Sequence, residues 1–160
     1  MAANTVSDWT IKTVNGQKVA TCTVLVDTAN QVAWTKKTPK GIDTSKKYTL
    51  MISASAAQDG QATPFVICCG TSDQFALSGT SSLTVDGGFN YKQIIDDLGY
   101  GSATTKAWII DPKLAVADVV ALASVASGLK VNVPATPYHA YCLNGGSTLL
   151  AHTLTFTIVQ

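Results

Sequence analysis

Two histidines are the side chains best suited to acid–base chemistry in this 160-residue sequence, because imidazole titrates near neutral pH. His139 precedes Cys142 by three residues, and a thiol beside an imidazole is what a cysteine nucleophile requires. In a strand, however, positions 139 and 142 point to opposite faces of the sheet. His152 shares the apolar face of its strand with Leu150 and Leu154, which favours a buried, hydrogen-bonded imidazole. We therefore predict no catalytic residue and no enzymatic activity.

Metal-ligating and phosphate-binding patterns are absent from the sequence. The cysteines and histidines lack the Cys-x2–4-Cys and His-x3–5-His spacings of zinc sites. Asp96-Asp97 is the only acidic pair, and neighbouring side chains on a helix diverge by about 100°, so the two cannot share one ligand. No P-loop, dinucleotide fingerprint, calcium loop or nucleophile elbow is present. The sequence predicts no cofactor and no metal.

Four cysteines, without a secretory signal before them, predict reduced thiols buried as small apolar residues. They are Cys22, Cys68, Cys69 and Cys142. Because neighbouring residues of a strand face opposite ways, Cys68 and Cys69 are expected on different faces.

The sequence contains few charged residues, and each sign of charge is carried by a single residue type. All eleven basic residues are Lys and all ten acidic residues are Asp, and charged residues form 13% of the chain against about 25% in typical domains. A nucleic-acid binder would need a basic excess and Arg forks, whereas the net charge is +1. The 46% of apolar residues excludes a disordered chain, and no run approaches the roughly 20 residues of a membrane span. With no secretion signal at its start, the chain is expected to be assembled in the cytoplasm without a membrane partner.

The length accommodates one domain, predicted over residues 9–160 and preceded by a flexible polar arm, residues 1–8. A hairpin is expected from Trp9 to Val26, because Asn15-Gly16 tolerates the positive φ angles of a type I′ turn. Alternating or continuous apolar patterns predict further strands over 31–34, 48–53, 65–69, 82–85, 107–110, 129–133, 138–143 and 149–159.

Two helices are expected to interrupt these strands. Asn90 as N-cap and Gly99 as C-terminal stop predict a short helix over 90–98. Asp111, Pro112 and Gly128 bound a second helix that is apolar on nearly all sides, as a helix packed on two sides or at a subunit contact would be. The predicted fold is mainly β, an antiparallel sandwich or irregular barrel with one or two helical insertions.

Low charge and Thr- or Ser-rich outward faces favour a structural subunit of a symmetric assembly, because charged residues are depleted at interface cores. A β-sandwich module that binds a small ligand or carbohydrate is the alternative, with three tryptophans as a stacking platform. Trp9 and Trp108 lie at predicted core positions, which leaves Trp34 as the edge or surface residue. An enzyme using Asp and His is the third hypothesis.

The segment 82–95 resembles a pattern of tailed-phage head-decoration (capsid-stabilising) proteins, in which a strand ends in glycine and is followed by an aromatic residue and a short helix. The segments 66–70 and 155–159 are similarly placed, whereas the Trp9–Val26 hairpin and the long helix depart from the pattern. The resemblance implies a mostly β, non-enzymatic and commonly trimeric protein of the virion, which binds the capsid surface. With the exposed Trp34, the contact residues expected are Asn4, Thr5, Val6, Trp9, Trp34, Gly87, Gly88, Phe89 and Tyr91.

Overall fold

Strands are the only regular elements of the computed structural model within the residues that it describes. Those residues are 5–26, 32–55, 65–70, 76–78, 84–86, 89–95, 105–112, 130–131, 136–144 and 152–160. The strands are β1 (Thr5–Val6), β2 (Thr10–Val14), β3 (Gln17–Val26), β4 (Val32–Trp34), β5 (Tyr48–Ala54), β6 (Phe65–Gly70), β7 (Ala76–Ser78), β8 (Thr84–Asp86), β9 (Phe89–Ile95), β10 (Thr105–Ile110), β11 (Lys130–Val131), β12 (Tyr138–Asn144) and β13 (His152–Val159). This confirms the predicted mainly β class.

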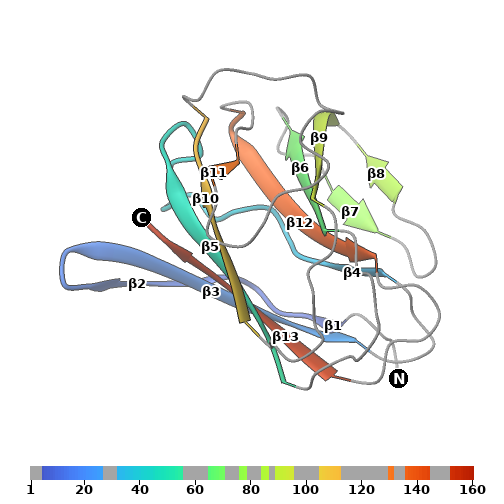
Figure 1. Ribbon diagram of the computed structural model, residues 1–160, viewed down its shortest axis with the longest axis horizontal. Coiled ribbons are helices and arrows are strands. Elements are labelled where there is room, and N and C mark those ends of the chain that lie inside the picture. Colours follow the sequence, from blue (N-terminus) through green and yellow to red (C-terminus); the bar gives the residue numbers. More distant parts are fainter. Residues whose placement is uncertain are drawn as a thin grey trace.

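The strands form two larger sheets and one separate pair (Figure 1). The seven-stranded sheet has the order β1-β3-β13-β5-β10-β11, with β2 also paired to β3; the four-stranded sheet has the order β4-β12-β6-β9, and β7 pairs with β8. All these pairs are antiparallel except β10 with β11. A parallel pair needs a long crossover connection, and β10 ends at Ile110 whereas β11 begins at Lys130.

The C-terminal strand β13 lies at the centre of the larger sheet, between β3 and β5. Its residues alternate as predicted: Leu154, Phe156 and Ile158 are buried, and the threonines between them are half-buried. Phe156 lies opposite Cys22 of β3 and Ile52 of β5, so the middle of β13 fixes the register of three strands.

One apolar core receives side chains from both larger sheets. Most of it comes from β3, β5, β10 and β13, while Ile67, Cys69 and Tyr141 enter from the four-stranded sheet. A smaller cluster lies on the other face of that sheet, where Cys68 and Cys142 contact Ala140 and Leu77. The adjacent cysteines therefore face opposite ways, as predicted, and all four cysteines are buried with free thiols.

The hairpin predicted at Asn15-Gly16 is present. β2 pairs with β3 from Thr10 opposite Thr21 to Val14 opposite Gln17, and the two turn residues have φ angles of 51° and 79°, as a type I′ turn requires. Every residue of β2 is exposed, and the hairpin projects from one end of the molecule (Figure 1).

The helix predicted over 90–98 is wrong where the structure describes it, because Phe89–Ile95 forms strand β9. β9 pairs antiparallel with β6 from Phe65 opposite Ile95 to Gly70 opposite Phe89. Aromatic and β-branched residues favour strands, and an edge of β6 without a partner would leave backbone groups unpaired. Pairing with β6 therefore outweighs the preference of Asn90 for the N-cap of a helix. The helix predicted from 111 to 128 lies outside the described residues beyond Pro112.

The predicted flexible arm, residues 1–8, is wrong for residues 5–8. Thr5 lies opposite Leu25 and Val6 opposite Val24, so β1 is part of the larger sheet. The Ser7 amide donates to the Thr23 carbonyl at 2.9 Å, and Val6 packs against the core. β3 extends past the end of β2, and its backbone groups there need partners. Residues 1–4 lie outside the described part of the chain.

Candidate functional site

The most reactive side chains lie inside the molecule. His139 is fully buried, with Nδ1 at 2.8 Å from the Tyr48 hydroxyl. That hydroxyl also lies 2.7 Å from the hydroxyl of Tyr141. Because Tyr48 is on β5 and the other two residues are on β12, these bonds join the two larger sheets. Cys142 lies in the smaller cluster on the other face of β12, which confirms that it does not face His139.

The segment that follows β4 forms hydrogen bonds with the backbone of β12 beside this network. The Thr35 hydroxyl accepts from the Tyr141 amide and the Thr38 hydroxyl accepts from the His139 amide, each at 3.1 Å. The amides of the same threonines donate to the carbonyls of Tyr141 and His139 at 2.9 and 2.8 Å. Buried polar groups with partners on both sides rigidify a fold, so these bonds have a structural role.

Burial raises the pKa of the thiols and phenols in the core still further above neutral pH. Desolvation raises the pKa of the Cys22 thiol to about 12, and desolvation raises the pKa of Cys69 further. It raises the pKa of Tyr48 and Tyr141 in the same way, and in Tyr48 the neighbouring Tyr141 adds to the shift. Since the thiolate is the nucleophile of cysteine chemistry, these thiols are held in their unreactive form.

The three tryptophans do not form a shared platform for a sugar ring. Trp108 is 1% exposed, as predicted for a core residue. Trp9 is half-buried, with its ring edge against Tyr141, and its indole N–H donates to the Lys36 carbonyl at 3.0 Å. Trp34 lies on β4 at the edge of the other sheet and packs on the smaller cluster. Each tryptophan therefore packs against a different set of neighbours.

The outer face of the larger sheet is uncharged across its central strands. Thr157 lies between Thr21 and Met51, and Thr155 lies between Thr23 and Ser53. Alternate residues of a strand share a face, so the described side chains of β3, β13, β5 and β10 that face away from the core are Gln17, Val19, Thr21, Thr23, Leu25, Thr153, Thr155, Thr157, Val159, Thr49, Met51, Ser53, Ala107 and Ile109. None of these side chains is ionisable.

The hairpin and the loop between β4 and β5 enclose a depression of 510 Å³ at one end of the molecule. The Lys18 Nζ donates to the Gly41 carbonyl at 3.0 Å. A Cβ at Gly41 would lie 2.6 Å from Cδ1 of Ile11, so a larger residue at position 41 would require the Ile11 side chain to shift. The depression is lined by Lys18, Lys40, Gly41, Ile42, Asp43, Thr44, Ser45, Thr136 and Pro137.

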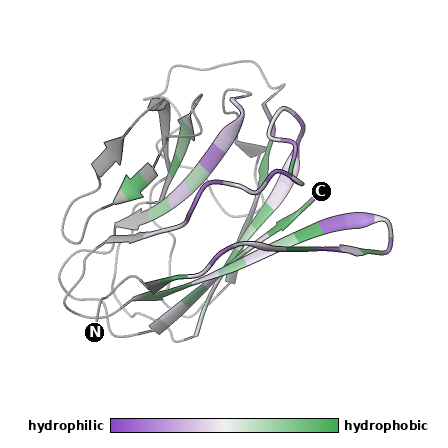
Figure 2. Ribbon diagram, turned by 180° about the vertical axis from the view of Figure 1, so that it is seen from behind, coloured by the Kyte–Doolittle hydropathy of each residue, from purple (hydrophilic) through white to green (hydrophobic). Residues whose placement is uncertain are grey.

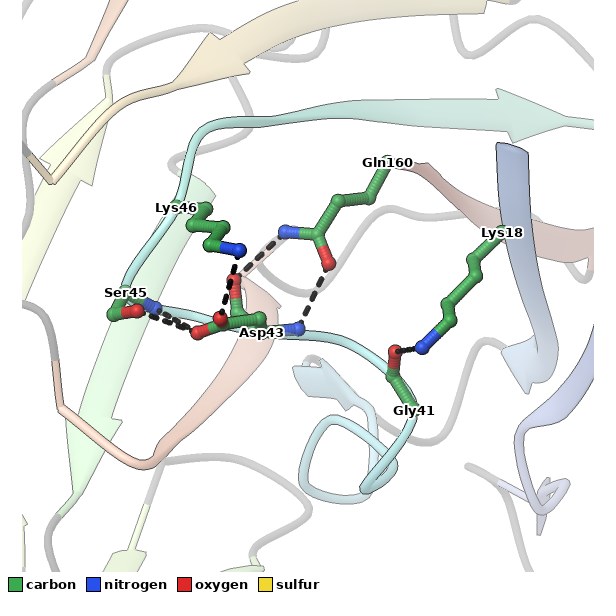
Figure 3. A network of polar contacts seen from close by, with 6 residues as sticks. All are labelled: Lys18, Gly41, Asp43, Ser45, Lys46 and Gln160. Carbon is green, nitrogen blue, oxygen red and sulfur yellow. Dashed lines mark hydrogen bonds and ion pairs between the residues drawn. The ribbon is translucent and has the colours of Figure 1, made fainter. Parts of the chain in front are cut away.

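A network of polar contacts holds this loop in place (Figure 3). The Gln160 side-chain amide donates to the Asp43 carbonyl at 2.7 Å and accepts from the Asp43 amide at 2.8 Å. The Asp43 carboxylate accepts from the hydroxyl and amide of Ser45 and lies 3.8 Å from Lys46 Nζ. The hydrogen bonds from Ser45 lower the pKa of Asp43. The depression is therefore lined by both signs of charge, the ammonium groups of Lys18 and Lys40 and the carboxylate of Asp43.

The structure separates the predicted contact residues. Val6 and Trp9 contact the main core, and Thr5 lies in β1 of the larger sheet. Phe89 and Tyr91 lie in β9 of the other sheet, so residues 89–91 form a paired strand in place of the expected exposed turn. Asn4, Gly87 and Gly88 lie outside the described residues. The predicted residues that the structure describes therefore lie on elements of both larger sheets.

Sequence reasoning missed four exposed residues at the hairpin end, Ile11, Val14, Lys18 and Lys40. Among the described residues, Ile11 and Val14 are the exposed large hydrophobics, at 39% and 43%. The sequence did carry one signal: neither strand of the hairpin contains an acidic residue, although each contains a lysine.

The described residues contain no group of histidine, cysteine or aspartate side chains that could hold a metal ion. Within the same residues, no helix has the length and apolar character needed to cross a membrane. No protein family model, no curated protein and no solved structure matches the chain.

Proposed function

We propose that this chain is a non-enzymatic structural subunit of a symmetric protein assembly, and that the outer face of its larger sheet contacts a neighbouring subunit. The observation that carries the proposal is the absence of charge among the described outward side chains of β3, β13, β5 and β10. Charged residues are depleted at the cores of protein interfaces, whereas lysine is a usual protective device on exposed strands.

The buried reactive groups support a non-enzymatic role. His139 and Tyr48 bond to each other between the sheets and are 0% and 2% exposed. The Cys22 thiol, with a pKa of about 12, is protonated at neutral pH. A substrate would have to open the core to reach these groups. We therefore assign these buried polar groups a role in the stability of the subunit and not in catalysis.

In its most specific form, the proposal is a capsid-decoration subunit of a phage particle. Such a subunit would form a homo-oligomer, with a trimer favoured, assemble in the host cytoplasm and remain in the virion without nucleic-acid or membrane contacts. The sequence resemblance over 82–95 and the mainly β fold support this form, while strand β9 replaces the helix of the resembled pattern. The core shared by both sheets supports a sandwich architecture.

The decisive test is the absolute mass of the protein by light scattering over a dilution series. We expect a species larger than the 16.7 kDa monomer. A T155K/T157K variant should dissociate, because it places two ammonium groups on the uncharged face, and T155V/T157V should assemble like wild type. A wild-type monomer at every concentration, or assembly that survives T155K/T157K, would contradict the proposal.

A further inference from the structure

Strand β2 is an edge of the larger sheet. Among the described strands it pairs only with β3, whose other side pairs with β13, and all five of its residues are exposed. Figures 1 and 2 show from opposite sides that the β2–β3 hairpin extends beyond the other strands, with hydrophilic residues at its tip (Figure 2). The outer side of β2 is therefore a place where another strand can extend this sheet.

The backbone groups of Ile11 and Thr13 point toward this open side. Thr13 lies opposite Lys18, and Ile11 lies opposite Ala20. The Lys18 carbonyl accepts from the Gln160 amide at 3.0 Å, so the backbone of Lys18 faces away from β2. In an antiparallel pair, such a residue and the one opposite it occupy a non-hydrogen-bonded position, and these positions alternate along the strand. The N–H and C=O groups of Thr13 and Ile11 are therefore directed outward, where no described residue bonds to them.

β2 lacks most of the features that protect exposed edges from pairing. Such edges usually carry several charges, a proline or a β-bulge. β2 has one charged residue, Lys12, no proline, and a register with β3 that continues without a shift. The exposed large hydrophobic residues of the described chain, Ile11 and Val14, are both on this strand. An edge of this kind binds an extended strand through main-chain hydrogen bonds and side-chain contacts.

A second copy of β2 is complementary to this edge, and charge selects the register. Antiparallel strands related by a two-fold axis exchange the same backbone groups, so each copy donates and accepts equally. With Lys12 on the axis, two lysines would lie directly opposite, which is destabilising. A register centred on Thr13 would place Ile11 opposite Asn15, beyond the end of β2. With Ile11 on the axis, the two isoleucines pair, and Lys12 lies opposite Thr10 of the other copy.

We propose that β2 pairs antiparallel with β2 of a second copy of this chain, with Ile11 on the two-fold axis. The two larger sheets then join into one, and their uncharged outer faces lie side by side as one continuous surface. This inference rests on the proposed function, because a contact of a few strand residues is too small to hold copies together by itself and needs the association that the outer face provides. A two-fold contact also combines with a three-fold axis in closed dihedral assemblies.

Cysteine cross-linking tests this register. The four native cysteines are buried, so a cysteine introduced on β2 supplies the exposed thiol. In the proposed contact the Cα atoms of the two Ile11 residues lie about 5.5 Å apart. Because a disulfide spans this distance, Ile11→Cys should form a covalent dimer under mild oxidation about tenfold faster than Thr13→Cys, as read on a non-reducing gel. Thr13 is the matched control, since it is exposed on the same face of β2 but its two copies would lie about 13 Å apart.

Light scattering of two substitutions at the axis gives a second measurement. Ile11→Lys places two ammonium groups directly opposite each other and should weaken association by about tenfold. Ile11→Val keeps the apolar pair and should assemble like wild type.

Three outcomes would overturn the inference: no covalent dimer of Ile11→Cys, equally fast cross-linking of Thr13→Cys, or wild-type association of Ile11→Lys. If T155K/T157K dissociates the assembly while Ile11→Cys does not cross-link, the proposed function stands and this inference falls. If Ile11→Cys cross-links as expected while T155K/T157K assembles like wild type, the edge contact stands and the outer-face contact falls. A wild-type monomer at every concentration removes both.

Discussion

The core between the two larger sheets and the hairpin end use polar groups in opposite ways. In the core, Tyr48, His139 and Tyr141 satisfy one another, and the described ionisable groups there are buried. At the hairpin end, Lys18 and Lys40 line an open depression beside the exposed Ile11. The described histidine, cysteine and tyrosine side chains of the core therefore bond or pack within the molecule. The described groups exposed at the hairpin end are lysines, the Asp43 carboxylate and a few apolar side chains.

The largest difference between the two regions is expected in the free energy of unfolding when a cavity is made in the core. Phe156→Ala removes a fully buried ring stacked on Tyr141, and such substitutions destabilise by about 3–5 kcal/mol. Val14→Ser removes an exposed side chain of the hairpin and should cost about 0.5 kcal/mol or less. Denaturant unfolding of both variants measures the difference. Equal losses would show that the hairpin is as much a part of the core as β13.

The next effect concerns the hydrogen bonds between the sheets. Tyr48→Phe removes the hydroxyl that bonds both His139 and Tyr141, and we expect a loss of about 1–3 kcal/mol because buried partners are left unsatisfied. Tyr138→Phe, at a half-buried position of β12, is the control and should change stability by about 0.5 kcal/mol or less. If both variants shift the midpoint of urea unfolding equally, the hydrogen bonds of Tyr48 do not hold the two sheets together.

Alkaline pH should weaken the core through its thiols. The Cys22 thiol ionises near pH 9.0 when exposed and only near pH 12 when buried. The unfolded state therefore loses this proton first, and stability that is complete below pH 9.0 should fall up to pH 12 by about 1.4 kcal/mol per pH unit for this group. Cys22→Ala should give a flatter profile between pH 9 and 11 in urea unfolding. Parallel profiles for the two proteins would contradict this assignment.

The smallest effect is expected at the surface, where Asp8 and Lys36 form an exposed ion pair at 2.5 Å. The hydrogen bond and charge of Lys36 lower the pKa of Asp8 below 3.8. The contribution of this pair is present above that pH and lost as the pH falls below it, and exposed pairs contribute little. Asp8→Asn should leave the melting temperature at neutral pH nearly unchanged. A loss as large as that of Tyr48→Phe would show that the pair anchors the edge of the sheet.

The sequence predicted correctly those elements that depend on interactions between residues close together in the chain. The Asn15-Gly16 turn requires positive φ angles that these two residues tolerate, and β13 has one buried and one half-buried face, which produces its alternation. β1 and β9 were not predicted, because both form by pairing with an edge supplied by a distant segment. For residues 90–95, a helix cap and strand-forming side chains compete locally, and β6 decides between them.

The hairpin end was beyond prediction for the same reason. Ile11 shares a face with residues that are buried elsewhere in the sheet, so alternation alone would place it in the core. The contact of Ile11 and Lys18 with Gly41 joins segments more than twenty residues apart. By contrast, the burial of the cysteines and the opposite facing of His139 and Cys142 follow from strand periodicity, and both are confirmed.

The central proposal is that this protein associates through the outer face of its larger sheet, while the core remains closed. Side-chain labelling of Met51 combined with hydrogen–deuterium exchange, at low and high protein concentration, tests it most directly. We expect reduced labelling of Met51 on the outer face in the concentrated sample, and no change in amide exchange at Phe156 in the centre of β13. If Met51 is labelled identically at both concentrations while the mass increases, the copies associate elsewhere and the account is contradicted.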